Sequence, residues 1–238
     1  MQLPSFNRRQ ALLLGGTALT GVAGKLLLGQ DRRPTSATED SHGYEKFLSA
    51  NGQPQILPAD KWGPTREDIL GPFFLNGAPF RGKTTPPMTG GDVLVVSGRV
   101  WNYATKQPVR HAMLDIWHCD SEGNYDMNDP KQPPARSQFR NRIRLMTDEM
   151  GAYEVEAIKP PPYSIGQNVY RPAHIHFLIQ APGMQKLITQ LYFAGDKHLK
   201  SDRWASQSDL VAPCQRQQGP TGAYLTTTFD IVLQPAAG

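Results

Sequence analysis

Short apolar runs of strand length, rich in Val, Ile, Leu, Tyr and Phe, recur along the chain from residue 93 onward. Turn signals such as Glu122-Gly123-Asn124 and Glu149-Met150-Gly151 separate these runs. In the final run Phe229, Ile231 and Leu233 lie two residues apart, which places them on one face against a core. The predicted strands span 93–101, 112–118, 141–147, 152–158, 173–180, 187–193 and 226–233. The pattern predicts an all-β fold, a β-sandwich of seven or more strands with long loops.

The run over 173–180 combines this strand pattern with candidate chemistry. His174 and His176 are two residues apart, so both imidazoles point to one face while Ile175, Phe177 and Ile179 line the other. Imidazole is the commonest protein ligand for transition metals, and strand neighbours at this spacing can reach one ion together. The pattern indicates half of a metal site on the face opposite the core.

Composition favours one domain with appendages. The 238 residues are 39% hydrophobic, enough for one sizeable core, and the 22 glycines and 21 prolines favour short strands and turns over long helices. The formal net charge is only +4, and Lys and Arg are scattered among acidic residues without a basic face. Nucleic-acid binding therefore has little support.

The N-terminal residues 1–24 are predicted to be an export signal. Ser5-Phe6-Asn7-Arg8-Arg9 precedes a moderately apolar segment that ends near Gly24, and the paired arginines resemble a twin-arginine signal. An ordinary secretory signal or an uncleaved membrane anchor is the alternative. We expect an exported, periplasmic or secreted protein that meets a membrane only through this signal.

Residues 25–61 are polar and predict a linker, so the catalytic sandwich domain is expected over 62–238. Cys119 and Cys214 are the only cysteines. An oxidising compartment would permit a disulfide between them if they lie close together, and two free thiols are the alternative.

A non-catalytic sandwich module of the kind found on bacterial surface proteins remains an alternative at this point. It gives no reason for two histidines to share the outer face, so the question is whether the chain offers further ligands. Tyr125 lies just beyond a predicted strand end, and Tyr163 follows the stiff Lys159-Pro160-Pro161-Pro162 segment. The other histidines have no paired ligand at metal spacing, so surface or capping roles are expected for them. They are His42, His111, His118 and His198.

Five motifs in order make the chain resemble the intradiol ring-cleavage dioxygenases, and within them the protocatechuate 3,4-dioxygenases most closely. They span roughly residues 62–233. The motifs are Leu70-Gly71-Pro72-Phe73-Phe74, Asp115-Ile116-Trp117-His118 leading to Gly123-Asn124-Tyr125, Ile158-Lys159-Pro160-Pro161-Pro162-Tyr163, Arg171-Pro172-Ala173-His174-Ile175-His176-Phe177 and Leu187 to Asp196.

The resemblance implies a non-haem Fe(III) ion held by Tyr125, Tyr163, His174 and His176. The hard, anionic oxygen of a tyrosinate favours Fe(III) over Fe(II), and the ion in turn lowers the pKa of the phenol. For the remaining tyrosines, packing with a hydrogen-bonded hydroxyl is the expectation.

The implied reaction inserts both atoms of O2 into a catechol and cleaves the ring between its two hydroxylated carbons to give a muconate-type diacid. Tyr163 is expected to take a substrate proton. Arg171 matches an arginine that stabilises the electron-rich substrate, with a surface ion pair as its alternative role. Gln190 matches a pocket residue whose role is steering O2 or substrate.

Some features depart from the family pattern. Ser164-Ile165 follows Tyr163 where the protocatechuate enzymes have a Pro-Trp pair, so the preferred catechol stays open. An export signal departs from the cytoplasmic setting of aromatic catabolism and suggests external phenolics as substrates. By analogy with the family we expect a homo-oligomer.

A cupin-like Fe(II) or Zn enzyme is the remaining alternative. It could use His174 and His176, but it wants a glutamate four or five residues beyond the second histidine. Gln180 and Ala181 stand there. A carboxylate ligand would therefore distinguish that enzyme from an intradiol dioxygenase.

Overall fold

The computed structural model describes residues 62–86, 90–127 and 131–237. The predicted export signal and the whole predicted linker lie outside the described residues. Within them are twelve strands and two short 3-10 helices. The elements are β1 (Val93–Asn102), β2 (Met113–Trp117), η2 (Arg136–Gln138), β3 (Arg142–Met146), β4 (Ala152–Ile158), β5 (Tyr163–Gly166), β6 (Val169–Arg171), β7 (His174–Gln180), β8 (Leu187–Phe193), η3 (Ala205–Gln207), β9 (Val211–Ala212), β10 (Gln215–Gly219), β11 (Gly222–Thr228) and β12 (Ile231–Leu233).

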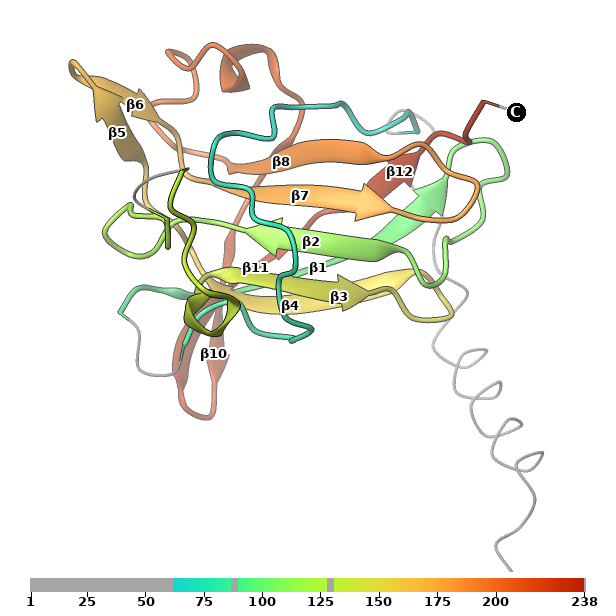
Figure 1. The fold of residues 1–238 in the computed structure, drawn as a ribbon, viewed down its shortest axis with the longest axis horizontal. Coiled ribbons are helices and arrows are strands. Elements are labelled where there is room, and N and C mark those ends of the chain that lie inside the picture. Colours follow the sequence, from blue (N-terminus) through green and yellow to red (C-terminus); the bar gives the residue numbers. More distant parts are fainter. Residues whose placement is uncertain (1–61, 87–89, 128–130, 238) are drawn as a thin grey trace, which may run out of the picture. The chain divides into compact units, whose positions relative to one another are not determined.

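The strands form two five-stranded sheets and a separate hairpin. One sheet has the order β3-β2-β7-β8-β9. In the other, β1 pairs antiparallel with β4 on one edge and parallel with β11 and then β12 on the opposite edge, while β10 extends the sheet beyond β11. Figure 1 shows the first sheet as one layer in front of the second, with the β5–β6 hairpin projecting at the end where β2 finishes and β7 begins. The predicted β-sandwich is confirmed.

The core lies between the two sheets. Ile175, Phe177 and Ile179 of β7 are completely buried, as their alternation predicts. The Phe177 ring packs against the ring of Phe229, which lies between β11 and β12 of the second sheet, with 5.1 Å between ring centroids. Each such side chain contributes on the order of 1.5–3 kcal/mol when it leaves water. The opposite face of β7 is therefore the one left for chemistry.

The predicted final strand over 226–233 is wrong in one respect, because it is two strands broken at Phe229 and Asp230. The Phe229 amide donates to the Ser97 carbonyl at 2.8 Å, and the Arg99 amide donates to Asp230 Oδ1 at 2.7 Å. Gly98 makes this possible, since a Cβ there would lie 2.0 Å from the Phe229 carbonyl oxygen. At this break the Asp230 side chain thus replaces a backbone acceptor between β1 and the end of the chain.

We expect the Gly98→Ala variant to be destabilised by at least about 2 kcal/mol, because backbone, rather than a flexible side chain, occupies the space of the new methyl group. Urea unfolding followed by circular dichroism measures this as a lower midpoint. Gly82→Ala is the matched control, since nothing lies within 4 Å of a Cβ at that position. Equal urea midpoints for the two variants would show that the backbone at Phe229 can move away from a methyl group at residue 98 without loss of stability.

Four of the strands were not predicted, and they are short, polar or exposed. β10 contains no apolar residue except its terminal glycine, and β9 has only two residues. The β5–β6 hairpin turns through Gln167 and Asn168, both with positive φ, and exposes Ile165, Val169 and much of Tyr170. None of these segments has the alternating apolar face on which strand prediction depends.

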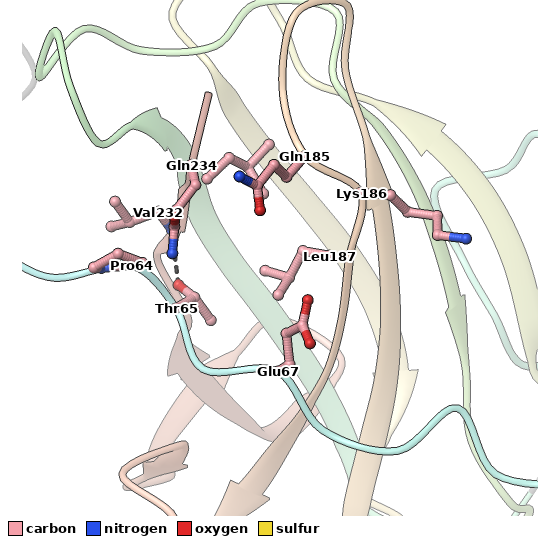
Figure 2. Close-up of a pocket in the computed structure, with 9 residues that line it drawn as sticks. Pro64, Thr65, Glu67, Gln185, Lys186, Leu187, Val232 and Gln234 are labelled. Atoms are coloured by element: carbon pink, nitrogen blue, oxygen red, sulfur yellow. Dashed lines mark hydrogen bonds between the residues drawn. The ribbon is translucent and has the colours of Figure 1, made fainter. Parts of the chain in front are cut away.

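The segment before β1 runs along the sandwich. Near its start, residues 64–67 pass the beginning of β8 and the end of β12 and line a cavity of about 30 Å³, shown with its lining residues in Figure 2. That volume holds about one water molecule. No helix among residues 62–86, 90–127 and 131–237 is long and apolar enough to cross a bilayer.

Candidate active site

The two histidines of β7 meet at their Nε2 atoms, which lie 3.1 Å apart. Both residues are buried, so segments outside the sheet cover the face that the strand pattern leaves free of core. His174 Nδ1 donates to the Pro172 carbonyl at 2.6 Å, which fixes the neutral ring with its lone pair on Nε2. His176 stacks on Trp117 with 4.7 Å between centroids and 4° between planes. Backbone and indole thus orient the two rings toward each other.

Burial keeps both imidazoles neutral. It lowers the pKa of His174 to about 3, with the Arg171 charge adding to the effect. Burial likewise holds the pKa of His176 well below its usual value, and His174 and Arg171 act in the same direction. Two unprotonated nitrogens are the form of histidine that binds a metal.

Two tyrosines complete the cluster. Tyr125 belongs to the loop after β2, and Tyr163 is the first residue of β5. Tyr125 Oη lies 3.5 Å from His174 Nε2, and the two phenol rings meet edge to face at 5.7 Å. Gly123, with φ of +87°, lets the loop approach closely, because a Cβ there would lie 2.9 Å from Tyr163 Cβ.

The loop that carries Tyr125 is anchored by a buried ion pair. Asp126, the next residue, pairs with Arg142 of β3, whose Nε donates to Asp126 Oδ2 at 2.8 Å. Arg142 Nη1 also donates to the Phe73 carbonyl at 3.1 Å, and the Phe73 ring stacks on Tyr125 at 4.1 Å. One guanidinium therefore joins the sheet, the Tyr125 loop and the segment before β1.

The four side chains fit a metal cation. Two nitrogen ligands about 2.1 Å from one ion and at right angles to each other lie about 3 Å apart, which matches the His174–His176 separation. Burial raises the pKa of Tyr125 well above its usual value and also raises that of Tyr163, although Arg171 partly offsets the second. A nearby multiply charged cation reverses this effect and favours the phenolate.

The residues that the structure describes contain no group of three or more His, Cys, Asp or Glu side chains at metal spacing. Any metal bound between His174 and His176 would therefore depend on the phenol oxygens for its remaining protein ligands. A cupin-type site requires a carboxylate beside the histidines, and among the described residues no carboxylate joins His174 and His176 in such a group.

A cavity of about 470 Å³ opens beside the tyrosines, and the two histidines are not among its described lining residues. Tyr125, Tyr163 and Arg171 line it together with mainly apolar residues from four parts of the chain. Tyr163 is only half-buried, whereas Tyr125 is 7% exposed. Tyr163 is thus the more accessible of the two phenols to a molecule that enters the cavity.

Arg171 is buried within a polar network, which excludes the alternative of a surface ion pair. Its Nε lies 2.7 Å from Asp202 Oδ2, at an angle that makes the contact a charge pair rather than a hydrogen bond. Its Nη2 donates to Gln190 Oε1 at 2.9 Å and to Tyr192 Oη at 3.2 Å. The guanidinium also covers the Trp204 ring, 4.5 Å from the centroid. These contacts fix a permanent positive charge at the cavity wall.

The chain matches known proteins over most of its length. A family model described as Dioxygenase matches residues 69–235. The catechol 1,2-dioxygenase of Pseudomonas sp. (strain EST1001) is 31% identical over 221 residues, which cover 82% of this chain and 72% of the relative. The chlorocatechol 1,2-dioxygenase of Rhodococcus opacus is 36% identical over 190 residues, covering 71% and 72%. The chain belongs to the intradiol ring-cleavage dioxygenase family.

Solved structures of this family share the fold of the present dioxygenase. The catechol 1,2-dioxygenase of Acinetobacter sp. ADP1 superposes with a TM-score of 0.65 at 25% identity and covers 85% of this chain and 80% of its own. The dioxygenase domain of a carbohydrate-binding fusion protein from Streptomyces sp. SirexAA-E gives a TM-score of 0.60 at 31% identity, with coverage of 73% and 100%. Family membership decides against the non-catalytic module and the cupin-like enzyme.

The dioxygenase structure brings all predicted site residues to one end of the sandwich. Their assignment as metal ligands or catalytic groups stays a prediction. The sequence did not point to Asp202 and Trp204, which lie far along the chain in an irregular segment and reach Arg171 only in the folded protein. The only sequence feature that could have pointed to them is that two charged residues, Asp202 and Arg203, directly precede Trp204.

A surface position expected for His118 is wrong, whereas its place seven residues before Tyr125 had left a position near the site open. His118 is 1% exposed, and its two ring nitrogens lie 2.7 Å from Thr84 Oγ1 and from the Cys119 carbonyl. His111 is exposed and pairs with Glu149, as expected for a surface histidine. His198 stacks on Tyr170 at 4.8 Å. His42 lies outside the described residues.

Both cysteines are free thiols in this dioxygenase. Burial raises the pKa of the Cys119 thiol to about 12, so it stays protonated and unreactive at neutral pH. The sequence left a disulfide and two free thiols as alternatives, and the structure shows two free thiols.

His118 gives a test of stability against pH. Burial lowers its pKa to about 4 from an ordinary 6.5, so the unfolded chain binds a proton first as the pH falls. We expect stability to be lost between pH 6.5 and about 4, by about 3 kcal/mol from this group. Urea midpoints across this range should fall less steeply for His118→Gln than for the wild type. Parallel curves would show that His118 does not titrate on unfolding.

Proposed function

We propose that this protein cleaves catechol-type aromatics between their two hydroxylated carbons with O2, using a non-haem Fe(III) ion held by Tyr125, Tyr163, His174 and His176. The observation that carries the proposal is the meeting of two phenol oxygens and two neutral imidazole nitrogens beside a cavity. Two phenolates and a hydroxide would balance the three positive charges of the ion. Its relatives named as catechol, chlorocatechol and hydroxyquinol 1,2-dioxygenases support the substrate class.

The bound iron supplies the Lewis acid that chelates the two catechol oxygens and makes the ring reactive toward O2. The remaining chemistry falls to the side chains. Tyr163 is the proposed base, because it lines the cavity and Arg171 favours its charged form. Tyr125, buried and covered by Phe73, is suited to a fixed position. The proton of one catechol hydroxyl would pass to the Tyr163 oxygen.

Arg171 is proposed to act on the ring after it binds, and Gln190 to hold Arg171 in position. A guanidinium fixed beside the cavity stabilises the negative charge that a catecholate brings, without having to reorganise. Gln190 is completely buried, and its amide donates to the Ile69 carbonyl at 2.8 Å while its oxygen accepts from Arg171. Gln190 therefore holds Arg171 against the wall, and any contact of Gln190 with O2 or substrate is secondary to this role.

A visible absorption spectrum of the iron-loaded protein tests the proposal. Tyrosinate bound to Fe(III) gives a broad charge-transfer band in the visible region, and anaerobic addition of catechol should move it to longer wavelength. Admission of O2 should then yield one equivalent of a muconate-type diacid. A colourless protein that retains stoichiometric iron would exclude the two-tyrosine site.

Three finer features also belong to this proposal. The closer resemblance to protocatechuate 3,4-dioxygenases rests on the five sequence motifs taken together. The paired Arg8 and Arg9 support a twin-arginine signal and a periplasmic or secreted location. Association into a homo-oligomer rests on analogy with the family. Cell fractionation and sedimentation of the mature protein test the last two.

A further inference from the structure

The cavity is larger than a simple catechol needs. Its volume of about 470 Å³ falls in the range of about 300–1,000 Å³ that takes drug-sized ligands, whereas catechol is a single ring with two hydroxyls. If the hydroxyls lie at Tyr125 and Tyr163, space remains toward the mouth. The residues along that space decide which ring substituents are favoured.

Half of the described lining residues are apolar. Six of the twelve have apolar or aromatic side chains without a formal charge or hydroxyl, and only one carries a formal charge. The six are Ile69, Pro72, Phe73, Met127, Ile165 and Trp204. A substituent that leaves water for this surface gains roughly 25 cal/mol for each Å² of apolar area buried. The wall therefore favours an alkyl or aryl group.

A carboxylate finds no free cation among the described lining residues. Arg171 is the one charged side chain; it pairs with Asp202 at 2.7 Å, and in the proposed reaction its charge already serves the catecholate oxygens. Arg203 lies against Trp204, but it does not line the cavity. A charged substituent would lose its hydration without gaining a new partner, which is costly.

Ile165 is placed to read the substituent. In the β5–β6 hairpin Ser164 pairs with Tyr170 and Gly166 with Val169, so Ile165 is the extra residue of a β-bulge. Bulges beside active sites redirect a side chain. Ile165 lines the cavity and is 54% exposed, two residues from Tyr163, so it lies at the mouth of the cavity.

We infer that this enzyme selects catechols that carry an uncharged apolar substituent over carboxylated catechols, and that Ile165 is a specificity-determining residue. The inference rests on the proposed function for the position of the ring hydroxyls. It deepens that proposal by naming the substituent class.

Three substituted catechols separate charge from size. 4-Isopropylcatechol and 3,4-dihydroxybenzoate carry substituents of nearly equal size that differ in charge, and 4-phenylcatechol tests the room at the mouth. For the iron-loaded wild type we expect kcat/KM for 4-isopropylcatechol to exceed that for 3,4-dihydroxybenzoate at least about tenfold. 4-Phenylcatechol should be cleaved at least as efficiently as catechol.

The Ile165→Lys variant should invert this preference. A cation at the mouth should raise kcat/KM for 3,4-dihydroxybenzoate about tenfold and lower it for 4-isopropylcatechol. Val169→Lys is the matched control, because Val169 is 51% exposed on the same hairpin and does not line the cavity. This variant adds the same charge at a site where solvent screens it, so we expect kcat/KM for each substrate to change by less than about twofold.

Dissociation constants from anaerobic titration calorimetry separate this inference from the proposed function. Suppose that catechol is cleaved but kcat/KM is equal for 3,4-dihydroxybenzoate and 4-isopropylcatechol, or that the two lysine variants change kcat/KM equally. The selectivity inference is then overturned, and the proposed dioxygenase activity stands. If no catechol is cleaved while the dissociation constants follow the predicted order and depend on Ile165, the selectivity stands and the proposed function fails.

Discussion

The His174→Ala variant is expected to bind Fe(III) at least about 100-fold more weakly than the wild type and to lose ring cleavage. Changes in groups that merely orient a ligand cost about 10–100-fold in metal affinity, so removal of the ligand itself should cost no less. His174 is also the side chain that contacts both His176 Nε2 and Tyr125 Oη. Iron content after dialysis against a chelator, together with the visible spectrum, measures the effect.

His198→Ala is the control for this experiment. It removes the same side-chain type from a half-buried position where the ring stacks on Tyr170 rather than on the cluster. We expect it to keep the iron content and colour of the wild type. Circular dichroism should show both variants folded, so that loss of iron reports the ligand. A folded His174→Ala protein with full iron and an unchanged band would refute the ligand assignment.

Local alternation predicted the parts of the site that sit on regular strands. His174 and His176 share a face of β7 because side chains on a strand have a period of two, and their sequence neighbours Ile175 and Phe177 are completely buried as that period requires. Tyr125 lies on a loop and Tyr163 begins the short, exposed strand β5, so alternation singles out neither. Only resemblance to a family singled them out among the tyrosines.

Features that depend on contacts distant in sequence could not be predicted. The strand breaks at Phe229 because the Phe229 carbonyl oxygen occupies the space that a Cβ at residue 98 would need, and only glycine leaves that space free. No local sequence pattern encodes this close approach. Asp202 reaches Arg171 across 31 positions of chain from an irregular segment. The burial of His118 likewise depends on Thr84, which lies before β1.

Removal of the Arg171 charge is expected to affect both stability and catalysis. In Arg171→Met, the buried Asp202 carboxylate loses its counterion, and breaking a buried pair in this way costs about 3–5 kcal/mol. Ring cleavage should fall by about 100-fold or more, because a fixed charge beside the developing negative charge is lost. Urea unfolding and the kcat of the iron-loaded protein measure the two effects separately.

The double variant Arg171→Met/Asp202→Asn distinguishes the two roles. With both charges gone, no uncompensated ion is buried, and the asparagine oxygen can still accept from the Trp204 and Ala205 amides as Asp202 does at 2.9 and 2.8 Å. We therefore expect the double variant to recover most of the lost stability and none of the lost kcat. Recovery of kcat together with stability would mean that Arg171 acts only by holding the fold. Persistent loss of kcat in a stable protein would place its charge in the reaction, because packing at the cavity wall would then be intact while the positive charge beside the catechol is missing.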